Sequence, residues 1–185
     1  MTLPRDAETA TIVPNYKPKG DPMDYIEEKI QKALEAIPAR AKTENWKGKK
    51  PWTKAVQKAI VDVAKGEKWG TAANHCEEAD ENREFLYDIF CYQPGEGSMT
   101  EVQLVAESEW YSEGHIIEDF DKLLVARSKY RVMVFQADSP KSVATLVEKM
   151  RSRIKTFSGS VGDRYLFAGW VGEPENRFFF DRHVV

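Results

Sequence analysis

The sequence predicts an α/β domain in which a mixed β-sheet is flanked by helices on both faces. Segments with apolar residues at helical spacing alternate with short apolar runs rich in strand-forming residues. Along the chain come helices, a strand pair, a helix, a strand, a helix and two final strands, an order typical of a layered α/β sheet. One run, at residues 130–136, is apolar almost throughout, as in a strand buried on both faces.

Length and composition indicate a single globular domain. The chain has 185 residues, of which 42% are hydrophobic and 31% are charged, so a mainly disordered protein is excluded. No apolar stretch approaches the roughly 20 residues that span a bilayer, and the N-terminus lacks the layout of a signal peptide. We therefore expect a cytoplasmic protein with no membrane partner. Cys76 and Cys91 lack a Cys-x-x-Cys spacing, and we expect both to be reduced thiols.

The chain begins with a segment that we expect to form no regular structure. Its prolines and terminal glycine predict a flexible N-terminal arm over residues 1–20, followed by the domain at 21–185. Asp21 and the proline after it supply an N-cap and a first-turn proline for a helix at about 22–37. Pro38 is expected to end this helix and to begin a basic linker.

The middle of the chain predicts one helix and a pair of antiparallel strands. A helix at about 51–68 has an apolar stripe opposite its lysines, and a short strand is expected at 71–74. Residues 84–92 are rich in strand formers and stop at a Pro-Gly turn. The next strand, at about 101–110, follows after a short connection, so the two strands should pair antiparallel.

The last third completes the sheet. We expect a helix at about 116–127, the buried strand, and a long helix from about 139 to 156. Two strands close the chain, at 164–171 and 177–182. Their aromatic residues leave open an interface between copies of the chain, that is, a homo-oligomer.

The expected strand at 101–110 carries two carboxylates on one side. Glu107 and Glu109 are two residues apart, so their side chains point to the same face of a strand. Adjacent anions in an otherwise apolar strand need a compensating cation, and a divalent metal ion is the simplest one. Asp88, in the strand before, could add a third carboxylate.

Charge is unevenly distributed along the chain although the formal net charge is only −3. Residues 40–68 are basic, residues 77–121 are strongly acidic, and the following segment is basic again. An acidic middle between basic ends suits a metal centre within a surface that attracts a polyanion, whereas an ordinary dipolar surface is the alternative. The expected contacts with nucleic acid, in particular DNA, are Lys47, Lys49, Lys50 and Lys54.

These residues resemble the PD-(D/E)xK nuclease superfamily. The resemblance covers about residues 84–136: a strand with Asp88, a strand with Glu107-x-Glu109, a helix with Lys122, and an apolar strand. It implies a restriction-endonuclease-like fold, a site that binds Mg²⁺ or Mn²⁺ through Asp88, Glu107 and Glu109, and hydrolysis of phosphodiester bonds. A main-chain carbonyl near Ser108 would complete the ligands.

The chain departs from the superfamily at one position. Glu109 stands where the signature lysine is expected. Lys122 on the next helix is the candidate for a lysine that has moved, and it would orient or deprotonate the attacking water. Equally, the departure is compatible with a degenerate nuclease fold that has lost catalysis.

Each candidate has a plainer interpretation. Asp88 could satisfy nearby backbone donors, Glu107 and Glu109 could lie on a solvated edge, and Lys122 could form a surface pair with Glu118. Two other functions therefore stay open. One is a non-catalytic module that binds nucleic acid or a protein, and the other is a metal-dependent hydrolase of a small phosphate ester.

Overall fold

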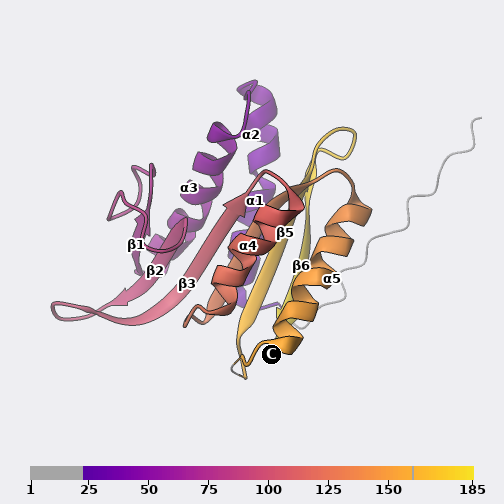
Figure 1. Ribbon diagram of the computed structural model, residues 1–185. Helices are drawn as coiled ribbons and strands as arrows, with labels where there is room; N and C mark the ends of the chain where they lie inside the picture. Colours follow the sequence, from indigo (N-terminus) through magenta and orange to yellow (C-terminus); the bar gives the residue numbers. More distant parts are fainter. Residues whose placement is uncertain (1–22, 160) are drawn as a thin grey trace, which may run out of the picture.

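A six-stranded mixed sheet forms the centre of the protein. The structure, a computed structural model, describes residues 23–159 and 161–185. The strands lie in sequence order across the sheet (Figure 1). They are β1 (Gly70–Ala73), β2 (Ile89–Pro94), β3 (Met99–Glu109), β4 (Tyr130–Ala137), β5 (Arg164–Val171) and β6 (Arg177–Val184). Strands β3, β4 and β5 are parallel to one another, and the other neighbours pair antiparallel.

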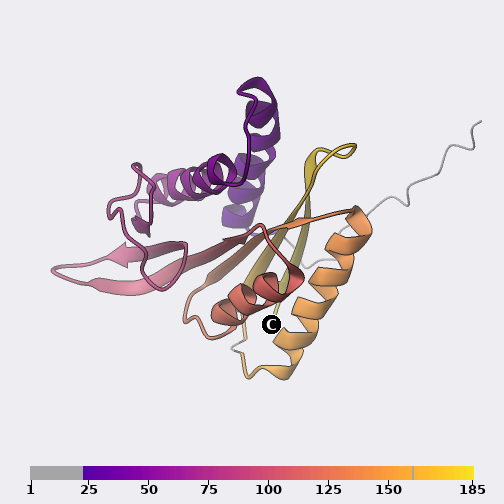
Figure 2. The ribbon, with the colours of Figure 1, turned by 45° about the horizontal axis from the view of Figure 1, so that its top comes forward.

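Helices cover both faces of this sheet, as the sequence predicted (Figure 2). They are α1 (Tyr25–Glu35), α2 (Ile37–Thr43), α3 (Lys50–Gly66), α4 (Glu113–Leu124) and α5 (Pro140–Thr156). Helices α1 to α3 bury one set of apolar side chains against the sheet, and α4 and α5 bury a second set against the other face. Alternate residues of a strand point to opposite faces, so each strand contributes to both cores. The α/β class and the mixed sheet are thus confirmed.

The first helices differ from the prediction. Asp24, rather than Asp21, caps α1: its side chain accepts a hydrogen bond from the Ile26 N–H, and Glu27 completes a capping box. Pro38 does not end helical structure but stands in the first turn of α2, where a missing N–H costs little. The expected basic linker is therefore partly helical. The expected N-terminal arm lies outside the described residues.

Most later elements match the prediction in type and order, with shifted ends, of which two concern the site. Strand β2 begins at Ile89, so Asp88 lies just before the strand rather than inside it. Helix α4 begins three residues earlier than expected because Ser112, in an extended conformation, stands at its N-cap. The antiparallel pairing of β2 with β3 is confirmed. Strand β4 is buried at every position except Gln136, as its apolar run predicted.

Both cysteines are free and buried, which confirms the expectation of reduced thiols. Among residues 23–159 and 161–185, no helix combines the length and the apolar character needed to cross a bilayer.

Candidate functional site

Two of the predicted site residues meet where β2 begins. Ile89 pairs with Ala106 in the antiparallel ladder of β2 and β3, so Asp88 lies opposite Glu107. Residues directly opposite each other in such a ladder have side chains about 5 Å apart. Ser108 fixes Asp88: its backbone N–H and its hydroxyl both donate to Asp88 Oδ2, at 2.9 and 2.8 Å. Asp88 therefore has the plainer role that was expected for it, because it accepts a backbone hydrogen bond. It also lies beside Glu107.

Glu107 is a buried carboxylate. Its exposed fraction is 2%, which rules out the solvated edge that was one interpretation of this residue. The Lys122 Nζ lies 3.4 Å from Glu107 Oε1, and the geometry of this ion pair falls short of a hydrogen bond. Within the described part of the chain, Oε1 has no hydrogen-bond partner. Burial, with the nearby charge of Asp88, raises the pKa of Glu107 to about 8.

Helix α4 adds two charged groups to the same place. The Lys122 Nζ lies 2.8 Å from Asp119 Oδ1, one turn earlier on the helix, and it pairs with Glu107 and Asp119 rather than with Glu118. Burial acts to lower the pKa of Lys122, but the hydrogen bond to Asp119 and the charge of Glu107 outweigh it and raise this pKa. The prediction missed Asp119, whose spacing of three residues from Lys122 was the available signal.

Asp88, Glu107, Asp119 and Lys122 form what we call the carboxylate cluster. When all four groups are ionised, three negative charges face one positive charge, and the cluster carries a charge of −2. Burial also raises the pKa of the half-buried Asp88, although the hydrogen bonds from Ser108 oppose this rise. A divalent cation would balance the excess charge.

Glu109 lies on β3 two residues from Glu107, as expected, and its side chain makes a local hydrogen bond. It is half-buried at the end of β3, and its Oε1 accepts a hydrogen bond of 2.6 Å from the Tyr111 N–H. In the described ranges, no group of three or more His, Cys, Asp or Glu side chains is placed so that it could hold a metal ion. A metal ion in the carboxylate cluster would therefore use Asp88 and Glu107 and complete its shell with water, which Mg²⁺ accepts.

The end of α4 is held by a buried arginine. Arg131 is 3% exposed, and it donates from Nε to the Leu123 carbonyl (3.0 Å) and from Nη2 to the Ala126 carbonyl (2.6 Å). Its charge is paired with Asp163 at 3.1 Å. A cation at these carbonyls is favourable because the C-terminal end of a helix carries partial negative charge. Arg131 thus fixes the helical turn that carries Lys122.

The backbone before Asp88 is strained. Leu86 has a φ of 69°, a left-handed conformation that leucine rarely adopts, and its side chain is 73% exposed. The next residue, Tyr87, is buried, and burial together with the charge of Glu107 raises the pKa of its hydroxyl. Backbone strain of this kind is concentrated at functional sites. The turn at Leu86 brings the chain into the sheet directly before Asp88.

The basic segment at residues 47–54 lies beside the end of β3. The Trp110 Nε1 donates to Thr53 Oγ1 at 3.0 Å, and the ring of Trp52 lies 6.2 Å from the ring of Trp110. These contacts attach the start of α3 to the residue that follows β3, on the face of the sheet covered by α1 to α3. Of the four predicted nucleic-acid contacts, Lys49 is half-buried and its Nζ lies beside the Tyr111 ring, whereas Lys47, Lys50 and Lys54 are exposed, and Lys54 lines a groove with His75 and Glu77.

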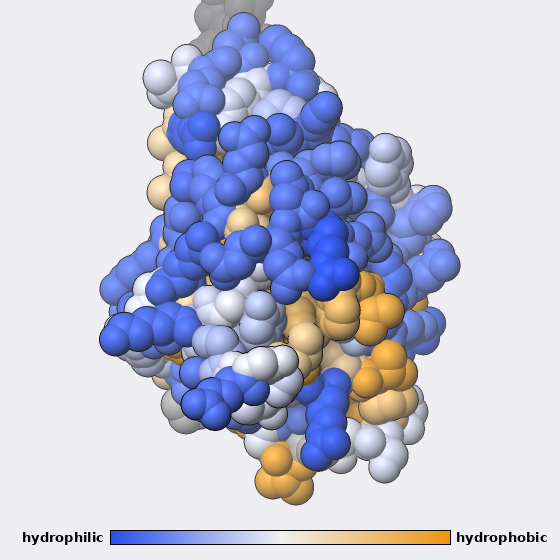
Figure 3. All heavy atoms as spheres, turned by 90° about the vertical axis from the view of Figure 1, so that its left-hand side faces the viewer, coloured by the Kyte–Doolittle hydropathy of each residue, from blue (hydrophilic) through white to orange (hydrophobic). Residues whose placement is uncertain are grey.

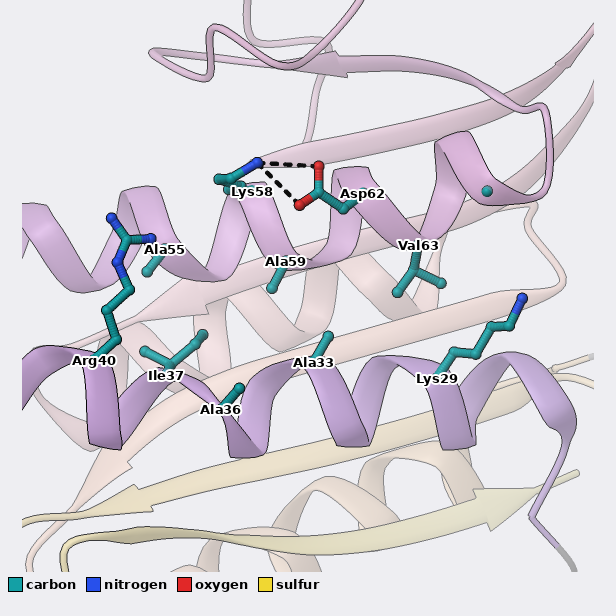
Figure 4. Close-up of a pocket in the computed structure, with 11 residues that line it drawn as sticks. Lys29, Ala33, Ala36, Ile37, Arg40, Ala55, Lys58, Ala59, Asp62 and Val63 are labelled. Carbon is teal, nitrogen blue, oxygen red and sulfur yellow. Dashed lines mark hydrogen bonds and ion pairs between the residues drawn. The ribbon is translucent and has the colours of Figure 1, made fainter.

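A groove elsewhere on the molecule has different chemistry from the carboxylate cluster. A groove of about 420 Å³ runs between α1 and α3, and small side chains such as Ala33, Ala36 and Ala59 form its floor (Figure 4). At its rim, Lys58 is paired with Asp62. On the side where β1, β2 and α3 lie, the surface is mostly hydrophilic and includes an apolar patch (Figure 3). The groove offers shape and apolar area but lacks the buried carboxylate that marks the carboxylate cluster.

Comparisons of the chain with family models, curated proteins and solved structures gave no significant match.

Proposed function

We propose that this protein is a metal-dependent nuclease with a restriction-endonuclease-like fold, which hydrolyses phosphodiester bonds of nucleic acid. The observation that carries the proposal is Glu107, a buried carboxylate opposite Asp88 with an ammonium group 3.4 Å away. Burial of an ionisable group is costly, and such groups are concentrated at sites that use them. The succession α3, β1, β2, β3, α4, β4 and the mixed sheet support the same fold.

Each residue of the carboxylate cluster has a role in this chemistry. Asp88 and Glu107 would hold Mg²⁺ or Mn²⁺, and bound metal would supply Lewis-acid stabilisation of the phosphate and a more acidic water. Lys122 would stabilise the negative charge that develops on the phosphate. Asp119 accepts a hydrogen bond from Lys122 and so keeps its ammonium group directed at the cluster. Glu109 would contribute through an ordered water rather than directly.

The basic segment supports a polymeric substrate. A small phosphate ester needs only the carboxylate cluster, whereas a nucleic acid also needs contacts with neighbouring phosphates. Lys47, Lys50 and Lys54 are exposed positive charges of the segment whose Thr53 is bonded to Trp110, the residue after β3. We therefore favour nucleic acid over a small ester as the substrate.

Cleavage assays with matched variants test the proposal. Wild type, Asp88→Asn and Glu107→Gln would be incubated with plasmid DNA, single-stranded DNA, RNA and a small phosphodiester, in Mg²⁺ or Mn²⁺. Glu101→Gln is the control, because Glu101 lies exposed on the same strand. We expect cleavage by the wild type and the control, and a loss of at least about 100-fold in the two site variants.

The substrates separate the alternatives. Cleavage of the small phosphodiester alone would favour a hydrolase of small esters. A folded wild type that cleaves none of these substrates in either metal would refute the proposal and favour a non-catalytic binding module.

A further inference from the structure

An exposed aromatic ring stands next to the strand that carries the carboxylates. Tyr111 follows β3 by two residues, and its side chain is 69% exposed. The Lys49 Nζ lies 3.1 Å from the centre of its ring, so a cation rests on one face of the ring. The ring of His115 lies 6.1 Å from the Tyr111 ring at an angle of 59°, and most of the Tyr111 side chain is open to solvent. Tyr111 and Lys49 together are called the Tyr111 platform below.

Both members of the Tyr111 platform are fixed to the end of β3. The Tyr111 N–H donates to Glu109 Oε1 at 2.6 Å, which sets the direction in which the chain leaves β3. Tyr111 is four positions after Glu107, and four extended residues span at most about 14 Å. Lys49 precedes the turn of α3 whose Thr53 is bonded to Trp110. The platform therefore stands within one or two nucleotides of the carboxylate cluster.

We infer that the Tyr111 platform binds an unpaired nucleotide next to the bond that is cut, so that the substrate is single-stranded nucleic acid or a single-stranded segment. This inference rests on the proposed nuclease function. An exposed aromatic face stacks on a nucleobase, and the adjacent ammonium binds the phosphate of the same nucleotide. In a duplex the base faces are already stacked on one another, and a base must first leave the stack before it can contact such a ring.

The chain contains a matched control for this chemistry. Tyr25 on α1 is 60% exposed, and the Lys29 Nζ lies 4.2 Å from the centre of its ring. This second pair has the same two residue types and similar exposure. It lies on α1, away from β3 and from the basic segment. A variant at Tyr25 therefore removes an exposed tyrosine without touching the Tyr111 platform.

Binding without cleavage is the decisive measurement. Labelled single-stranded DNA, single-stranded RNA and the corresponding DNA duplex would be titrated with wild type, Tyr111→Ala, Tyr111→Phe, Lys49→Met and Tyr25→Ala. Fluorescence anisotropy in EDTA reports binding, and circular dichroism reports folding. The two single strands show whether the platform distinguishes DNA from RNA.

For Tyr111→Ala we expect single-strand binding weaker by about 5- to 100-fold, because stacking is worth about 1–3 kcal/mol per base. Tyr111→Phe retains the ring and should bind within about twofold of the wild type, as should Tyr25→Ala. Lys49→Met should weaken binding and reduce its dependence on salt. Duplex binding should change by less than about twofold in Tyr111→Ala.

Three results would overturn the inference. The first is that the wild type does not bind single strands. The second is that Tyr111→Ala binds single strands as tightly as the wild type, and the third is that Tyr111→Ala loses equal affinity for single strands and duplex. The nuclease proposal is tested separately, because EDTA excludes catalysis from the binding assay. Cleavage by the wild type with no effect of Tyr111 would refute only the platform, and Tyr111-dependent binding without any cleavage would refute only the nuclease.

Discussion

Replacing Glu107 by glutamine should stabilise the metal-free protein, and more so at higher pH. The folded environment raises the pKa of Glu107 from its ordinary 4.5 to about 8, so the folded protein holds this proton where the unfolded chain has lost it. The contribution of Glu107 to the free energy of unfolding is therefore largest below about pH 4.5, where the group is protonated in both states. This contribution declines as the pH rises and is lost above about pH 8. Glutamine resembles the protonated acid at every pH and removes this decline.

The size of the effect follows from the same pKa. A rise from 4.5 to about 8 corresponds to at most about 5 kcal/mol, at about 1.4 kcal/mol for each pKa unit. Between about pH 5 and about pH 8, the linkage relation gives a relative gain of about 3 kcal/mol for Glu107→Gln. Such a gain is a large fraction of the stability of an ordinary domain.

Urea denaturation in EDTA, followed by tryptophan fluorescence, measures this gain at several pH values. Glu101→Gln is the control, because Glu101 is exposed on the same strand and should follow the wild type at every pH. If the difference between Glu107→Gln and wild type stays constant from about pH 5 to about pH 8, Glu107 is ionised throughout, and the reasoning about its burial is wrong.

Three further predictions concern other parts of the structure. Mn²⁺ should raise the urea midpoint of the wild type, because a ligand that binds the folded state stabilises it by mass action, but it should not raise the midpoints of Asp88→Ala or Glu107→Gln. Equal shifts in all three proteins would place the metal elsewhere. Arg131→Met should lower the free energy of unfolding by about 3–5 kcal/mol, because it leaves Asp163 without this partner and uncaps α4. Loss of only a few tenths of a kcal/mol, measured in urea, would contradict that role. Cys76 and Cys91 should react with a thiol reagent only on unfolding, since burial raises the pKa of both thiols; rapid labelling of the folded protein would contradict their burial.

The sequence was sufficient for the order of the strands and of α3, α4 and α5, and for the antiparallel pairing of β2 with β3, but not for α2. Helical and alternating apolar patterns depend on which residues are buried, and burial dominates the structure of α3, β4 and α5. The ends of elements depend on local capping instead. Asp24 was as good an N-cap candidate as Asp21, and Ser112 was an available N-cap for α4, so only the packed structure fixes these two helix starts.

The parts of the site that were missed depend on side-chain direction. Glu118, Asp119 and Asp121 are three acids within one turn of α4, and the rotation of the helix decides which of them meets Lys122. That rotation is set by Ile116, Phe120 and Leu123, which face the core. The position of Glu109 likewise depends on its hydrogen bond to the Tyr111 N–H, a contact beyond the reach of strand periodicity.

The four residues of the carboxylate cluster all lie between residues 88 and 122 of the chain. The lysines at residues 47–54 belong to a separate, earlier segment. This segment is anchored through its tryptophans: Trp46 and Trp52 lie edge to face with ring centres 5.7 Å apart, and Trp52 also contacts Trp170. In the proposed nuclease, the metal-binding residues and the substrate-binding lysines would therefore belong to separate segments of the chain. Substitution of the exposed lysines between these aromatic anchors should then alter binding of the proposed substrate and leave the carboxylate cluster intact.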